Sequence, residues 1–146
     1  MQMSSRGRHF ILPHYNGFDD KARRAVTPIQ NEAIRKGELV RPTKCNICGF
    51  SDPAHPQGRG YIYLHTEDYR LALLIYPLCK RHHADLHARF RDPERWQRVL
   101  RQYARPGAWF TLLSLDPASQ WRSLSETYPE GLPPADDPPQ GILFTQ

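Results

Sequence analysis

Cysteine and histidine occur in this sequence as two pairs with the same short spacing. Two residues separate Cys45 from Cys48, and two separate Cys79 from His82. This gap lets both side chains reach one ion, and zinc accepts imidazole as readily as thiolate. The pairs therefore predict one structural Zn2+ held by all four residues, with His83 as the alternative fourth ligand. The competing interpretation is that the cysteines are small buried hydrophobic residues.

Three further histidines predict a second metal site, distinct from the first. His83 and His87 are four residues apart on a predicted helix, so their rings lie on one face. His65 ends a predicted strand, just before a hairpin that leads back toward this helix. The alternative is that the three are exposed histidines on a basic helix. Basic residues nearby are expected to hold nucleic-acid phosphates: Arg59, Lys80, Arg81 and Arg89.

The composition places these side chains in a small protein with a limited core. The 146 residues fit one domain plus a tail, and only 39% of them are hydrophobic. A metal ion would therefore contribute more to stability here than in a richer core. The three cysteines, without a secretory signal, indicate a reducing, cytoplasmic location rather than disulfides. A net charge of +5 suits a polyanion such as DNA, and no apolar run is long enough to cross a membrane.

The residue pattern predicts an α+β fold. Apolar residues recur at helical spacing before the first cysteine, and short strand-like runs lie between the two cysteine segments. Residues 108–115 are apolar and fit either a strand or a helix. The expected elements are a helix or helix pair over 19–37, bent near Pro28 and stopped by Gly37, strands over 61–65 and 71–76, and helices over 79–90 and 93–103.

The order of these motifs resembles that of phage-type HNH endonucleases. The resemblance covers about residues 20–90, and the motifs that carry it are the run 34–45, Cys48-Gly49, His65 with Asp68-Tyr69, and Pro77-Leu78-Cys79 with His83. It implies a small ββα-metal core, in which a hairpin and a helix enclose a divalent ion and zinc knuckles brace them. It also implies metal-dependent hydrolysis of DNA in a bacterium or phage-infected cell, with Mg2+, Mn2+, Ni2+ or Zn2+ as the catalytic ion.

Carried over by position, the resemblance implies a catalytic set of His65, Asp68 and His83, and an ion held by His65, His83 and His87. Two positions depart from the family pattern. His82 replaces the fourth zinc cysteine, and Thr66 replaces the general-base histidine. A threonine hydroxyl cannot accept a proton at neutral pH. Either His65 is itself the base, or Glu67 or Asp68 acts through a water, or the domain binds nucleic acid or a protein without cutting, as a regulator or inhibitor.

The remaining stretches are predicted to surround this domain. The HNH-like zinc-binding domain is expected over 19–105, after a basic arm over 1–18. A C-terminal extension over 106–127 is expected to pack on it, and 128–146 is a Pro-rich acidic tail. The end of this tail, 141–146, is predicted either to dock on a protein partner as a strand or to fold back. Three isolated histidines are expected to have no functional role: His9, His14 and His55.

Overall fold

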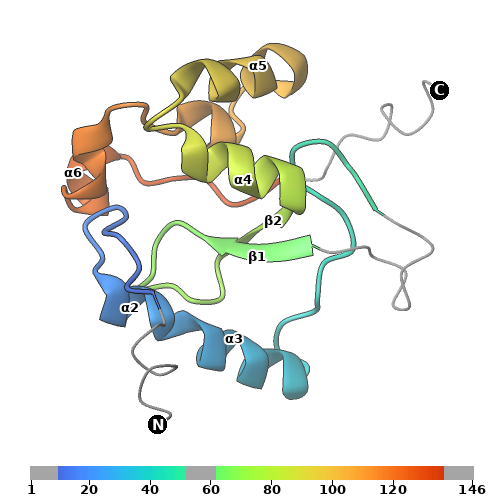
Figure 1. Ribbon diagram of the computed structural model, residues 1–146. Helices are drawn as coiled ribbons and strands as arrows, with labels where there is room; N and C mark the ends of the chain where they lie inside the picture. Colours follow the sequence, from blue (N-terminus) through green and yellow to red (C-terminus); the bar gives the residue numbers. More distant parts are fainter. Residues whose placement is uncertain (1–9, 52–61, 137–146) are drawn as a thin grey trace, which may run out of the picture.

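The computed structural model describes residues 10–51 and 62–136, which form an α+β fold (Figure 1). Within these residues the sheet is one antiparallel hairpin of β1 (Ile62–Thr66) and β2 (Ile75–Cys79). Ile62 pairs with Cys79 and Thr66 pairs with Ile75. Strand β2 leads directly into helix α4 (Lys80–Ala88), whose N-cap is Cys79. One continuous strand and helix therefore carry a cysteine and the neighbouring histidines.

The sequence predicts a helix or a helix pair before the first cysteine, and the structure has a pair whose break is not at Pro28. Helix α2 (Asp20–Arg24) and helix α3 (Val26–Arg35) are separated at Ala25. Pro28 lies in the first turn of α3, where a backbone N–H has no partner within the helix, so the proline costs no hydrogen bond. Gly37 follows the helix with a φ of +79°, a left-handed conformation that ends it as predicted.

The second strand lies four residues later than the sequence predicts. The backbone N–H of Leu71 donates to the carbonyl of Asp68, and that of Leu74 donates to the carbonyl of Leu71, so this segment is a turn. Leu71 is 52% exposed, so the apolar run over 71–76 is not a buried strand over its whole length. The strand begins at Ile75 because the register of the hairpin pairs it with Thr66.

The C-terminal third packs on the hairpin and α4. Helix α5 (Pro93–Tyr103) lies across α4, and α4 lies between α5 and the hairpin (Figure 1). The apolar stretch over 108–115 contains a short 3-10 helix, η1 (Trp109–Leu112), and is followed by η2 (Pro117–Gln120) and α6 (Leu124–Thr127). Trp96 of α5 and Trp109 of η1 are fully buried, so the C-terminal third supplies much of the core.

Segments at both ends of the described chain belong to this packed structure. Tyr15 and Asn16 are buried, although the sequence places them in a basic arm. At the other end, the hydroxyl of Tyr76 donates to the Pro133 carbonyl at 2.9 Å, and Arg105 forms an ion pair with Asp136 at 2.7 Å. Residues 10–18 and 128–136 therefore lie along the domain, while the predicted docking segment 141–146 lies outside the described residues. Within the described ranges, no helix has the length and apolar character needed to cross a membrane.

Candidate metal centres

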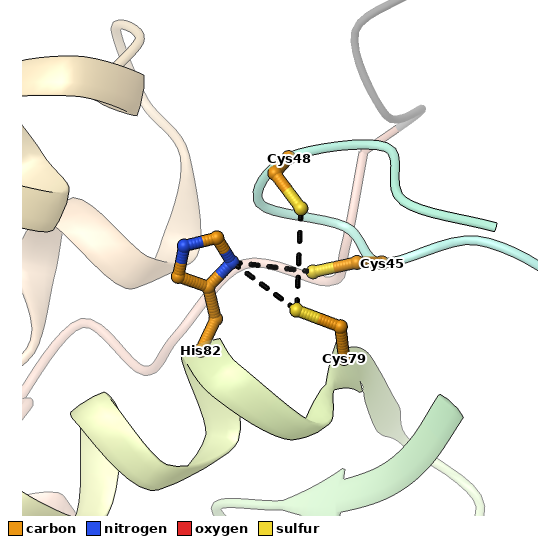
Figure 2. A group of neighbouring side chains, drawn as sticks. All are labelled: Cys45, Cys48, Cys79 and His82. Atoms are coloured by element: carbon orange, nitrogen blue, oxygen red, sulfur yellow. Dashed lines mark hydrogen bonds between the residues drawn. The ribbon is translucent and has the colours of Figure 1, made fainter. Parts of the chain in front are cut away.

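Three cysteines and one histidine converge where the hairpin meets α4 (Figure 2). His82 Nδ1 lies 3.3 Å from Cys79 Sγ and 3.9 Å from Cys45 Sγ, and the Sγ atoms of Cys48 and Cys79 are 4.0 Å apart. Tetrahedral bonds of about 2.3 Å to sulfur place neighbouring ligand atoms about 3.7 Å apart. The four side chains therefore form a cluster that could hold a metal ion such as zinc.

The turn that carries the first two cysteines is anchored to the core. Its backbone folds back through a hydrogen bond from the Gly49 N–H to the Cys45 carbonyl at 2.8 Å. The N–H of Asn46 donates to the Pro77 carbonyl of β2 at 2.7 Å. The Asn46 side chain in turn accepts from the indole N–H of Trp109 at 2.6 Å. The turn is thus held against β2 and the C-terminal extension in the position that its cysteines require.

Without a cation, the four side chains compete for protons. Hydrogen bonds with Cys48 and Cys79 hold the pKa of Cys45 far below its usual value, and the same contacts with Cys45 and Cys79 raise the pKa of Cys48. Burial would lower the pKa of His82, but hydrogen bonds with the sulfurs of Cys45 and Cys79 raise it to about 9. Three adjacent thiolates would repel one another, and a divalent cation would remove this conflict.

A second group of possible ligands consists of His65 on β1 and His83 and His87 on α4. One ring nitrogen from each lies within 4.8 Å of the others, and the Nε2 atoms of His83 and His87 are 3.1 Å apart. Burial, followed by the neighbouring charge of His65, lowers the pKa of His83 to about 3 and that of His87 well below its usual value. Both rings are therefore neutral at physiological pH and offer lone pairs to a cation.

A buried carboxylate orients the first of these histidines. Glu67 Oε2 lies 2.6 Å from His65 Nε2, and it also accepts from the Tyr15 hydroxyl at 2.6 Å. The side chain of Asn16 donates to Glu67 Oε1, and Arg89 donates to the Tyr15 hydroxyl at 3.0 Å. Burial would raise the pKa of Glu67, but the hydrogen bond and charge of His65 lower it. Because a carboxylate only accepts, His65 donates through Nε2, and its Nδ1 can bind an ion once that nitrogen carries no proton.

Replacement of Glu67 by glutamine tests this arrangement. The amide cannot accept from His65 and Tyr15 with the strength of a carboxylate, so the His65 ring loses its fixed orientation. We expect the affinity of the histidine cluster for Mn2+ to fall about 10- to 100-fold, as is usual for partners of metal ligands. Titration followed by electron paramagnetic resonance measures this affinity. Glu32→Gln on the exposed face of α3 is the matched control. If Glu67→Gln binds Mn2+ with the affinity of the wild type, the assignment is contradicted.

Two predicted site residues have other partners in the structure. Arg89 is fully buried and donates to the Ser114 carbonyl at 2.7 Å as well as to Tyr15, so its predicted contact with phosphate is wrong. Asp68 lies outside the histidine cluster and forms an ion pair with Arg70 at 2.9 Å. Its charge is therefore already compensated by an arginine of its own turn.

The other described residues that were predicted to contact phosphate are exposed, whereas Thr66 is buried. Lys80 and Arg81 are exposed on α4, and Arg59 lies outside the described residues. Thr66 is buried, and its hydroxyl accepts from the side chain of Gln30 on α3 at 3.0 Å. The position of the expected general base is thus filled by a side chain that faces a neighbouring helix.

A cleft of about 410 Å³ lies beside the histidine cluster and contains residues that the sequence did not single out. His83 and His87 line it together with His14, Arg23 and Arg91. The segment that carries His14 is held in place because Arg23 donates to the carbonyl of Pro13 at 2.6 Å. His14 was predicted to have no functional role because it stands alone in the sequence, and only tertiary folding brings it to the cleft.

The cleft, the histidine cluster and the cysteine cluster lie around one helix, α4. Consecutive residues of a helix are rotated by roughly 100°, so His82 and His83 belong to different clusters although they are adjacent. No family model, curated protein or solved structure significantly matches the chain. Its function is therefore inferred from the side chains at these sites.

Proposed function

We propose that this chain is a metal-dependent nuclease of the HNH type that hydrolyses phosphodiester bonds in DNA. The observation that carries the proposal is the convergence of His65, His83 and His87, where a hairpin meets a helix, beside a cleft lined by Arg23 and Arg91. This is the arrangement implied by the resemblance to phage-type HNH endonucleases. Under this proposal the Cys3His cluster holds a structural Zn2+ that braces the hairpin against α4.

The three histidines fit a divalent ion because two of them are neutral and the third is oriented by Glu67. A divalent ion bound there would stabilise negative charge on the scissile phosphate and on the leaving oxygen. The guanidinium groups of Arg23 and Arg91 place positive charge on the same cleft, where they would attract and orient the phosphodiester.

A nuclease also needs a base to activate water, and Thr66 cannot serve. Glu67 already accepts from three side chains, and Asp68 is paired with Arg70. His14 lines the cleft but lies outside the metal cluster, and no hydrogen bond involves its ring within the described part of the chain. We therefore assign His14 as the general base of the proposed reaction.

The proposal is tested by incubating the protein with supercoiled plasmid and Mg2+, Mn2+ or Ni2+. We expect nicking by the wild type and a loss of at least about 100-fold in His65→Ala and His83→Ala, because each substitution removes a ligand of the ion. Asn31→Ala on the exposed face of α3 is the control. Absence of nicking by the wild type with all three metals would overturn the proposal. Nicking that survives both histidine substitutions would indicate a contaminating nuclease.

A second function is favoured by the burial of Thr66 against Gln30. A domain that has replaced its general base could retain the HNH-like fold as a zinc module that binds nucleic acid or a protein partner, as a regulator or inhibitor. This second function is supported if the wild type binds DNA without nicking it and His83→Ala binds DNA with the same affinity.

A further inference from the structure

A second basic cleft is lined by residues of α4 and α5. Helix α5 lies on the side of α4 away from the hairpin (Figure 1). Its volume is about 430 Å³, and His82 of the cysteine cluster forms part of its wall. The histidines of the other metal cluster do not line it. The remaining polar side chains around it are Arg81, Asp85, Arg95, Arg98, Gln102 and Tyr103. This cleft is therefore separate from the one proposed for the catalytic ion.

The charges around this cleft are mostly uncompensated. Arg81 and Arg98 are exposed, and neither forms an ion pair within the described ranges of the chain. Arg95 donates through Nε to the carboxylate of Asp85 at 2.6 Å, and Asp85 is buried. This contact fixes the guanidinium at the cleft and leaves its two terminal nitrogens available. The cleft is therefore lined by three guanidinium groups and one carboxylate.

We infer that this cleft binds the phosphodiester backbone of a nucleic acid, as a contact surface additional to the cleft beside the histidine cluster. Guanidinium groups match phosphate oxygens in charge and geometry, and a phosphate takes hydrogen bonds from several donors at once. Gln102 and Tyr103 add neutral donors of the kind that contact the backbone without reading sequence. The polar lining does not suit an apolar ligand.

The position of the cleft also suits a nucleic acid. A helix with its side chains is about 10 Å wide, so two clefts on different sides of α4 lie within the length of one turn of DNA, about 34 Å. One polymer can therefore contact both clefts, which a small anion cannot do. The identification of the ligand as DNA rests on the proposed function, because the histidine cluster and the cleft beside it are the features that indicate DNA.

The double variant Arg81→Gln/Arg98→Gln tests the inference by fluorescence anisotropy with a labelled 20-base-pair duplex over a range of salt concentrations. We expect at least about tenfold weaker binding, and a salt slope smaller by about 2, since each lost phosphate contact removes about 0.9 from the slope. The control is Arg35→Gln/Lys36→Gln, which removes the same charge from the exposed C-terminal end of α3. Zinc content and the melting temperature show that each variant is folded.

The possible results separate this inference from the proposed nuclease. Unchanged affinity and slope in the Arg81/Arg98 variant would overturn the inference, whether or not the wild type nicks DNA. An equal loss in the Arg35/Lys36 control would also overturn it, because the effect would then reflect net charge alone. Competition by poly-glutamate as strong as that by unlabelled DNA would exclude recognition of phosphate. Arginine-dependent binding by a wild type that never nicks would support the cleft and reject the nuclease.

Discussion

Cys79→Ser is expected to leave the domain largely unfolded under conditions in which the wild type is folded. Cys79 is buried, joins β2 to α4 and contributes its sulfur to the Cys3His cluster. Structural zinc contributes about 10–16 kcal/mol of apparent free energy in zinc-finger peptides, whereas whole domains are stable by only about 5–15 kcal/mol. A chain with 39% hydrophobic residues has little other burial to replace this contribution.

Thermal unfolding followed by circular dichroism, with zinc measured by mass spectrometry, tests this expectation. We expect the melting temperature of Cys79→Ser to fall by about 15 °C or more, since each kcal/mol shifts it by roughly 3 °C at this size. His82→Cys is the matched control, because it changes a neighbouring ligand but leaves a four-cysteine site, and it should retain both zinc and stability. Cys79→Ser with a full zinc content and an unchanged melting temperature would show that the cluster is not structural.

The members of the cysteine cluster could be predicted because their geometry is local. Two-residue gaps bring Cys45 close to Cys48 and Cys79 close to His82, whatever the rest of the chain does. The choice between His82 and His83 depended on where the helix begins. With Cys79 as its N-cap, the first turn of α4 returns His82 to Cys79, and His83 is rotated toward His65 on the hairpin.

The surroundings of the histidine cluster could not be predicted, because they depend on contacts between distant segments. Glu67 binds Tyr15, which is 52 residues away, and Arg89 binds the same tyrosine across 74 residues. Arg89 has the sequence context of an exposed basic residue. It is buried because its guanidinium finds partners in the N-terminal segment and in the C-terminal extension, for which no local pattern exists. The same reason explains why the sequence alone indicates no role for His14.

His14→Ala is expected to slow plasmid nicking by at least about 100-fold, while Mn2+ binds the histidine cluster as in the wild type. A general base contributes about 10²- to 10⁴-fold to a reaction rate, and no other unpaired base lines the described part of the cleft. His14 is not a member of the metal cluster, so its loss should leave the ligand set intact. Single-turnover nicking rates and Mn2+ titrations measure the two quantities separately.

Added imidazole provides the decisive control for this prediction. The alanine variant leaves space in the cleft, so free imidazole should restore part of the rate by accepting the proton in place of the missing ring. His14→Gln keeps much of the volume of the side chain without a base, and it should stay slow when imidazole is added. A rate unchanged by His14→Ala would mean that His14 is not the base. A lost rate accompanied by lost Mn2+ affinity would mean that His14 supports the metal site instead, through its ring contact with Trp121 and the packing of the N-terminal segment.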